Sequence, residues 1–430
     1  MKKNTALLFY YNKENRYGIN ALAGSIECCE DLLQDIDIVF PYDEDVLYKT
    51  TEKLVKSHEK IILCFSFFTT QLWDIKRMLN KLRKDHGKHI HCIAGGPHPT
   101  GAPAGTLAMG FDVVALGEGE GTLRDIVSAI KNDGNLSDVK GIAYIDDKKN
   151  VCYNAHRPPL ELDSFTPFSV KYNKIGPIEI TRGCRFSCSY CQTPNIFPGK
   201  PRHRSVETIF EYVEIMKKLK RKTFRFISPD ALSYGSPDGR KVNLAKIYEL
   251  LSGVRKISGK SGRIIFGFFP SEIRPEHVTT ESMELITRFT HNNRFAIGAQ
   301  SGSERMLERC RRGHTVDDIY NAARIIKGAG KMVIVDFIFG MPGETAHDIQ
   351  DTIKVMRDLV DMDATIHAHT FTPLPATPFA NEPAGKVSPE VIAAVNSFMP
   401  SGRAFGDWQA QEQMAGKIAE YLQNTQIKQS

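Results

Sequence analysis

Long apolar runs are missing from this sequence. Nowhere do about eighteen apolar residues follow one another, so the chain lacks a segment that could cross a membrane as a helix. The N-terminal stretch MKKNTALLFYYNKENRYG has a basic pair but only a short apolar run, which is unlike a secretory signal peptide. We therefore expect a cytoplasmic protein with no membrane partner.

Cysteine is sparse and unevenly placed. The chain has nine cysteines, and three of them fall in the segment 184–191. A long chain without an export signal is not expected to build a disulfide framework. Clustered cysteines are instead typical of metal sites, so the spacing predicts a metal centre.

A strong excess of positive or negative charge is also missing. The formal net charge is +6, with Lys and Arg interspersed among Asp and Glu, so a nucleic-acid partner is not indicated. Hydrophobic residues make up 41% and charged residues 25% of the chain, which is the composition of a globular protein. We find no low-complexity tract and no solenoid repeat. At 430 residues the chain is expected to form two large units, or one barrel plus an appended domain.

The first part of the chain, residues 1–150, alternates short apolar runs with segments of helical periodicity. This alternation predicts a parallel sheet with crossover helices, an α/β fold of the flavodoxin-like (Rossmann) type. The expected strands are 6–11, 37–41, 61–67, 90–94 and 113–116.

Small and polar residues follow three of these strands. They are Ser66, Thr69, Gly95, Gly96, His98, Gly117, Glu118 and Gly119. In open parallel sheets ligands bind beyond the carboxyl ends of the strands, and glycine lets a ligand approach the backbone closely. These residues are therefore expected to bind a cofactor, although tight strand-to-helix turns would explain the glycines equally well.

A proline-bearing segment, residues 151–175, is expected to be a linker. Residues 176–380 again alternate strands with helices, and six such units predict a partial (β/α)6 barrel with its working residues at the carboxyl ends of the strands. Residues 381–430 are expected to form a small helical C-terminal segment. The expected barrel strands are 178–181, 223–227, 264–269, 295–299, 333–339 and 365–370.

Cys184, Cys188 and Cys191 lie on one loop directly after the first barrel strand. Three thiolates can hold three irons of a [4Fe-4S] cluster, which leaves the fourth iron free to bind a substrate. A structural zinc site is the alternative, with Cys152, Cys310 or a histidine as the fourth ligand.

The CxxxCxxC spacing, with Tyr190 before the last cysteine, resembles that of the radical S-adenosylmethionine (SAM) superfamily. The resemblance extends through 202–207, 227–230, 298–303, 312–315 and 340–345. It implies that the cluster passes an electron to SAM and that a 5′-deoxyadenosyl radical takes hydrogen from the substrate. It also implies an electron donor such as a ferredoxin or flavodoxin.

This resemblance assigns further residues by position. Tyr190 is expected near the adenine, and Asp230 is expected to be catalytic. The turn of Gly340 and Pro342 suits the presentation of backbone amides to a ligand, or simply ends a strand. Two other strand ends are expected to contact the ribose and methionine parts of SAM: Ser271 with Glu272, and Gln300 with Ser301.

Beside such a barrel, the N-terminal domain with its Gly-Gly-Pro-His-Pro-Thr and Leu-Gly-Glu-Gly-Glu segments resembles the cobalamin-binding domain of the B12-dependent class. The resemblance implies a methyltransferase that transfers a methyl group from cobalamin to an unactivated carbon. One departure is clear: residues 12–18 lack the DxHxxG motif that supplies an axial histidine in many cobalamin proteins. Cobalt would then have another lower ligand, or the domain would bind no cobalamin.

Two histidines, His367 and His369, lie two residues apart at the end of the last barrel strand, and so share a face. We expect them to be catalytic and to transfer protons or orient the substrate, although a hydrogen-bonded structural pair is equally consistent. Asp336, inside an apolar strand, must be paired or functional. The His-Ala-His-Thr-Phe stretch resembles archaeal cobalamin-binding radical SAM proteins, which implies a protein or peptide substrate, with glutamine C-methylation of methyl-coenzyme M reductase as the candidate.

Two other functions remain open. The Gln-Ser-Gly-Ser and Arg-Gly-His-Thr segments also resemble methylthiotransferases, but these have three more N-terminal cysteines. Here Cys28, Cys29, Cys64 and Cys92 do not reproduce that pattern. A non-enzymatic cobalamin- or redox-binding protein is the second alternative, and it would need no open iron.

Overall fold

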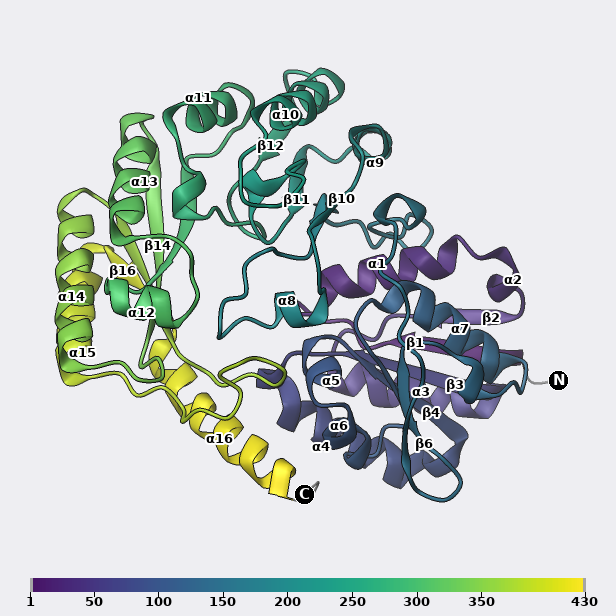
Figure 1. Cartoon of the computed structure of the whole chain (residues 1–430). Coiled ribbons are helices and arrows are strands. Elements are labelled where there is room, and N and C mark those ends of the chain that lie inside the picture. Colours follow the sequence, from purple (N-terminus) through teal and green to yellow (C-terminus); the bar gives the residue numbers. More distant parts are fainter. Residues whose placement is uncertain (1–2, 428–430) are drawn as a thin grey trace. The chain divides into compact units, whose positions relative to one another are not determined.

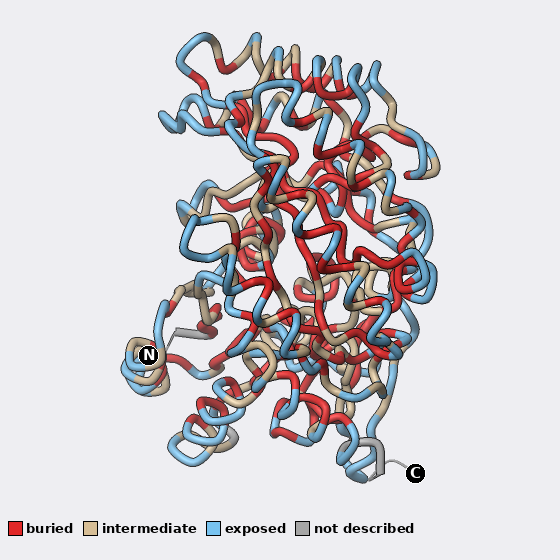
Figure 2. Tube along the Cα trace, turned by 90° about the vertical axis from the view of Figure 1, so that its left-hand side faces the viewer, coloured by how far each residue is buried: buried red, intermediate tan, exposed pale blue. Residues whose placement is uncertain are grey.

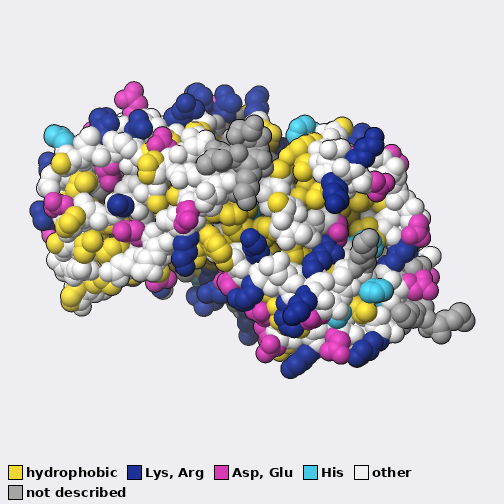
Figure 3. Space-filling model, turned by 90° about the horizontal axis from the view of Figure 1, so that it is seen from below, with side chains coloured by type: hydrophobic (Ala, Val, Ile, Leu, Met, Phe, Trp, Pro, Cys, Tyr) yellow, Lys and Arg dark blue, Asp and Glu magenta, His cyan; other side chains and the backbone are white. Residues whose placement is uncertain are grey.

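The computed structural model describes residues 3–427, which form two units: the first ends at Gly176 and the second begins at Pro177. In each unit the buried residues lie inside and the exposed residues at the periphery (Figure 2). Basic and acidic side chains are interspersed on the face shown in Figure 3. Among the described helices, none has the length and apolar character needed to span a membrane.

The first unit is built on a seven-stranded sheet of order β2-β1-β3-β4-β5-β6-β7 (Figure 1). The first five strands are parallel and β6 and β7 are antiparallel. The order 2-1-3-4-5 of the parallel part is that of flavodoxin-like folds, so the predicted fold is confirmed. The bounds are β1 Lys3–Phe9, β2 Ile36–Val39, β3 His58–Ser66, β4 Ile90–Gly95, β5 Val113–Ala115, β6 Ile142–Ile145 and β7 Val151–Tyr153.

Helices cover both faces of this sheet (Figure 1). On one face α1, α2 and α7 pack their apolar side chains against Leu7, Phe9 and Ile62 of the strands. Continuous burial of β1 and β3 explains why these strands appear in the sequence as apolar runs rather than alternating patterns. The helices are α1 Arg16–Glu27, α2 Glu30–Leu33, α3 Glu44–Ser57, α4 Leu72–His86, α5 Pro97–Gly101, α6 Pro103–Ala108 and α7 Gly119–Lys131.

The segment 151–175, expected to be a linker, is built into the first unit. It opens with the edge strand β7, which pairs with β6. Farther along, Ser169 Oγ donates to the Glu27 carboxylate at 2.5 Å, and Phe168 is buried. The first unit therefore extends to Gly176 rather than residue 150.

The second unit is a partial (β/α) barrel, as predicted. Its strands form two sheets, of order β12-β11-β8 and β13-β14-β15-β16. Parallel bridges Ser228–Ser271 and Ile273–Ile297 join them in sequence order. The bounds are β8 Ile178–Glu179, β11 Thr223–Ile227, β12 Arg263–Ile265, β13 Arg294–Gln300, β14 Met332–Phe339 and β15 Thr365–Thr370, with a small antiparallel pair of β9 Thr181–Arg182 and β10 Arg202–His203.

Amphipathic helices connect the barrel strands. Ser and Thr residues cap several of them: the Thr345 side chain, for example, accepts from the Asp348 backbone N–H at the start of α14. The helices are α8 Thr193–Ile196, α9 Val206–Lys218, α10 Leu244–Ser258, α11 Thr280–Phe289, α12 Glu304–Arg309, α13 Val316–Gly328 and α14 Ala346–Asp361.

The C-terminal segment carries two helices, α15 Pro389–Phe398 and α16 Trp408–Ile427. Between them β16, Ala404–Phe405, pairs in parallel with β15 and adds a strand that the sequence did not predict. The segment thus contributes side chains next to the last predicted barrel strand.

Candidate active site

The three clustered cysteines lie on the loop after β9, and Cys188 is the most buried of them. The loop is held by backbone hydrogen bonds from Ser189 N to Cys310 O and from Phe379 N to Ser189 O, each 3.0 Å long. The loop is therefore fixed by two elements of the barrel.

The three sulfurs of this loop are not arranged as ligands of a single zinc ion. The Sγ atoms of Cys184, Cys188 and Cys191 do not all lie within 4.8 Å of one another, and no other described ligand atoms join them in such a group. Two sulfurs bound to one zinc at about 2.3 Å can be no more than about 4.6 Å apart. Ligands at the corners of a larger iron-sulfur cube are farther apart, which agrees with a [4Fe-4S] cluster at this loop.

A buried arginine lies against this loop. Arg312 Nη1 donates to Cys188 Sγ at 3.6 Å, and Nη2 donates to Gly298 O at 2.6 Å. Arg312 is 9% exposed, and no described carboxylate forms an ion pair with it. A buried cation needs an anion nearby, and a cluster with three thiolate ligands supplies one.

The second unit contains a cavity of about 290 Å³. It brings together three residues predicted to bind SAM with one predicted catalytic histidine. The residues that line it include Tyr190, Glu272, Gln300, Asp336, His369 and Gln411. The hydroxyl of Tyr190 is buried and has no hydrogen-bond partner within the described chain, which leaves it available to a ligand.

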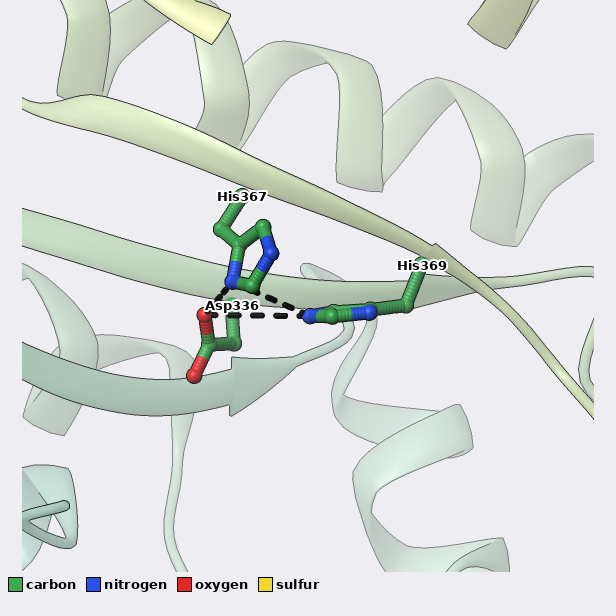
Figure 4. Close-up of side chains that lie close together, drawn as sticks. All are labelled: Asp336, His367 and His369. Carbon is green, nitrogen blue, oxygen red and sulfur yellow. Dashed lines mark hydrogen bonds and ion pairs between the residues drawn. The ribbon is translucent and has the colours of Figure 1, made fainter. Parts of the chain in front are cut away.

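Beside this cavity Asp336, His367 and His369 form a close cluster (Figure 4). His367 Nδ1 lies 2.8 Å from Asp336 Oδ1 and 3.1 Å from His369 Nε2. The His367 ring stacks on Phe405 of β16 at a centroid distance of 4.4 Å. The two histidines do face the barrel interior together, as their spacing predicted, and Asp336 is their partner.

Glu272 adds a second carboxyl group to this region. Burial, followed by the nearby Asp336 carboxylate, raises the pKa of Glu272 to about 7. The barrel interior therefore holds a carboxyl group that changes protonation state near neutral pH.

Asp230, predicted to be catalytic, lies apart from the cavity lining. Its Oδ2 contacts His277 Nδ1 at 2.6 Å, and its Oδ1 accepts from the backbone N–H groups of Leu232 and Arg274, each at 3.3 Å. Both oxygens are engaged within the protein, and the structure does not bring Asp230 together with His367 and His369.

Other residues that were predicted to contact SAM also form hydrogen bonds within the protein. Ser271 Oγ donates to Ser228 O at 3.2 Å, and Ser301 Oγ lies 3.3 Å from Thr352 Oγ1. Gly340 N donates to Glu344, and Pro342 O accepts from Arg309 Nε. Their backbone positions at strand ends agree with the prediction, whereas their contacts with SAM stay predictions.

In the first unit the predicted cofactor residues gather at the carboxyl ends of β3, β4 and β5. Gly96 has φ +93°, and a Cβ built there would lie 2.9 Å from Ser66 Oγ. Gly117 N donates to Thr100 Oγ1 at 3.1 Å. At Gly95 a Cβ would meet nothing nearer than Ala115 Cβ at 3.8 Å. A side chain could thus be accommodated at Gly95, whereas Gly96 is required by the turn itself.

Glu118 and Gly119 have structural contacts. Glu118 Oε2 accepts from Leu160 N at 3.3 Å, which ties the segment 151–175 to this strand end. A Cβ at Gly119 would lie 3.0 Å from Leu22 Cδ2 of α1, so this glycine allows α1 and α7 to pack closely.

His98 is fully buried. Its Nδ1 lies 3.1 Å from Thr69 Oγ1, and its ring stacks on Phe67. That His98 contacts a cofactor stays a prediction. What the structure shows is that its ring packs within the turn.

Burial lowers the pKa of His98 to about 4, which predicts a loss of stability in acid. The unfolded chain binds a proton below about pH 6.5 while the folded unit does not. The contribution of the neutral ring is therefore complete above pH 6.5 and falls as the pH drops toward 4, by about 2 kcal/mol at pH 5. His98→Gln should lack this extra loss when urea unfolding is compared at pH 7 and pH 5; an equal pH dependence in both proteins would contradict it.

Comparison with known proteins identifies both units. A model of the radical SAM superfamily matches residues 178–356, and a model of the B12 binding domain matches residues 11–127. Residues 178–356 therefore form a radical SAM domain, and residues 11–127 form a B12 binding domain. These domains define its cofactors as a [4Fe-4S] cluster, SAM and cobalamin, which confirms the cofactor predictions.

Curated relatives are distant. An uncharacterized methyltransferase of Pyrococcus horikoshii is 24% identical over 345 residues, covering 76% of this chain and 71% of the relative. A putative methylthiotransferase of Methanocaldococcus jannaschii is 28% identical over 246 residues, which is 56% of this chain and 51% of that protein.

Solved structures share the fold. The radical SAM methyltransferase TsrM from Kitasatospora setae, with cobalamin and a [4Fe-4S] cluster bound, has a TM-score of 0.67 at 14% identity, covering 89% of this chain and 78% of that chain. The cobalamin-dependent SAM radical enzyme OxsB with aqua-cobalamin bound has a TM-score of 0.64 at 18% identity, over 83% of this chain and 52% of that chain. At these identities the likeness concerns the fold.

Three site residues were not identified from the sequence: Arg312, Phe405 and Gln411. Arg312 lies in a segment that resembles the superfamily, but nothing in that resemblance placed it against Cys188. Phe405 and Gln411 come from the C-terminal segment, where no motif marks them.

Proposed function

We propose that this chain is a cobalamin-dependent radical SAM methyltransferase that methylates an unactivated carbon. The observation that carries the proposal is the joining, in one chain, of a B12 binding domain to a barrel whose three-cysteine loop fits an open [4Fe-4S] cluster. When bound, these groups supply hydrogen-atom abstraction and a transferable methyl group.

The residues of this chain then have distinct tasks. Cys184, Cys188 and Cys191 hold the cluster, and Arg312 offsets its negative charge. Tyr190, Glu272 and Gln300 line the cavity in which SAM would bind.

Asp336, His367 and His369 present polar groups to the substrate end of the cavity. The electron donor is proposed to be a ferredoxin or flavodoxin.

A methylthiotransferase would need further cysteine ligands in the first unit, and Cys64 and Cys92 are poorly placed to be among them. Cys64 and Cys92 are buried in β3 and β4, where burial raises the pKa of the Cys92 thiol to about 12 and that of Cys64 still further. They pack as small apolar side chains. This favours methyl over methylthio transfer.

The proposed substrate is a protein side chain, with a glutamine of methyl-coenzyme M reductase as the candidate. The support is the resemblance of residues 367–371 to archaeal cobalamin-binding radical SAM proteins. A peptide containing the target residue should gain the mass of one CH2 group only when SAM, reductant and cobalamin are all present. Methylation without cobalamin would refute the cobalamin-dependent mechanism, and a gain that includes sulfur would identify a methylthiotransferase.

A further inference from the structure

Three side chains of β14 and β15 point potential metal ligands toward one another (Figure 4). Asp336 Oδ1, His367 Nδ1 and His369 Nε2 are separated by 2.8, 3.1 and 4.0 Å. The Asp336 side chain is 7% exposed and the histidine side chains are each about one-third exposed. The cluster is thus partly enclosed but reachable.

The separations of these atoms match those of ligands to one ion. A single point lies about 2.0 Å from all three atoms, as the three distances require. First-row divalent ions hold imidazole nitrogen and carboxylate oxygen at about 2.0–2.2 Å. These distances therefore suit an ion of octahedral or square-planar geometry, with Asp336 Oδ1 and His369 Nε2 on opposite sides of it.

With Asp336 ionised, two neutral histidines do not satisfy this arrangement. A ring nitrogen of neutral imidazole has either a hydrogen or a lone pair. If His367 Nδ1 donates to Asp336, then His369 Nε2 must face it with a lone pair. The other nitrogen of His369 lies 3.3 Å from Gln411 Nε2.

The orientation of the Gln411 side chain fixes the role of the other His369 nitrogen. Its Oε1 accepts from Thr370 N at 2.9 Å, which turns the NH2 group toward His369 Nδ1. His369 would then need lone pairs on both nitrogens, which neutral imidazole does not have. A cation at the centre of the three atoms removes the conflict between Asp336, His367 and His369.

We propose that Asp336, His367 and His369 bind one first-row divalent transition-metal ion, separate from the [4Fe-4S] cluster. Two imidazoles and one carboxylate suit such ions. Asp336 and His369 also line the cavity of about 290 Å³, so the remaining coordination positions are open to water or to an oxygen or nitrogen of a substrate. The inference does not rest on the proposed methyl transfer.

Manganese binding tests the site directly. The anaerobic holoprotein, with its cluster oxidised and its cobalamin as Co(III), is titrated with Mn²⁺, and free Mn²⁺ is followed by its EPR signal. The wild-type protein should remove one equivalent per chain, and Zn²⁺ should then return the signal because it binds such ligands more tightly. Absence of a stoichiometric site in the wild-type protein would overturn the proposal.

Variants separate this site from surface binding. His367→Asn and Asp336→Asn should each weaken Mn²⁺ binding at least about tenfold. His347→Asn is the matched control, because His347 forms an exposed pair with Asp351 at 3.0 Å and should bind Mn²⁺ as the wild type does. Iron content and the thermal melt show whether each variant is folded. A folded His367→Asn protein with unchanged Mn²⁺ affinity would refute the site.

A variant of Gln411 supplies a second test, in which Mn²⁺ binding should become tighter rather than weaker. A metal on His369 Nε2 leaves a hydrogen on Nδ1, which the Gln411 NH2 group cannot accept, so the amide must turn over. In Gln411→Glu a carboxylate can accept from both His369 Nδ1–H and Thr370 N–H, as metal-bound histidines commonly require. Mn²⁺ should bind this variant more tightly than the wild type, and unchanged or weaker binding would count against the proposal.

Discussion

Replacing Cys188 with alanine should abolish assembly of the iron-sulfur cluster and, with it, reductive cleavage of SAM. Cys188 is 5% exposed and its sulfur accepts from buried Arg312. Without the thiolate the cluster loses one of three ligands and Arg312 loses its anion. Iron analysis, the optical spectrum and 5′-deoxyadenosine formation in the anaerobic protein would measure the loss.

Cys310→Ala is the matched control for this experiment. Cys310 is also buried, and its Sγ donates to Met341 Sδ at 3.2 Å. We expect this variant to keep its cluster at a loss of about 1 kcal/mol in stability. Loss of metal from Cys310→Ala but not from Cys188→Ala would show that the ligand set is wrong.

Replacing Gly96 with alanine should destabilise the first unit by about 3 kcal/mol and weaken cobalamin binding at least tenfold. The backbone at Gly96 has φ +93° and ψ −171°, a region almost restricted to glycine that costs other residues about 1–3 kcal/mol. The new Cβ would also lie 3.0 Å from Phe67 N. Urea unfolding and the optical titration of aquacobalamin would measure the two effects.

Gly259 provides a control with similar backbone angles. Its φ is +67° and its ψ is −171°, but nothing lies within 4 Å of a built Cβ. Gly259→Ala should therefore show the backbone strain alone and keep normal cobalamin binding. If Gly96→Ala binds cobalamin as tightly as Gly259→Ala does, the turn after β4 is not part of the cobalamin site.

Periodicity and burial explain which parts of the fold were predictable. β1 and β3 are long, apolar and buried, so both appear clearly in the sequence. β7 and β16 have only three and two residues, too few to show a period of two. The segment 151–175 was therefore expected to be a linker, and β16 was not expected at all.

The candidate site likewise has parts that the sequence predicted and parts that it did not. The cysteine spacing and the two histidines at alternate positions of one strand are local patterns, so the sequence could place the cysteines on one loop and the histidines on one face of a strand. The partners of these residues are not local: Asp336 comes from the neighbouring strand, and Gln411 comes from α16, 42 residues after His369. Such contacts depend on how β14, β15 and α16 pack, which no spacing in the sequence encodes.

The proposed function requires one cluster and one corrinoid in the same chain. Protein purified without oxygen and supplied with iron, sulfide and cobalamin should show, by optical spectrum and metal analysis, one [4Fe-4S] cluster and one cobalt per chain. Two clusters without cobalt, or colourless protein with zinc at the cysteines, would contradict it.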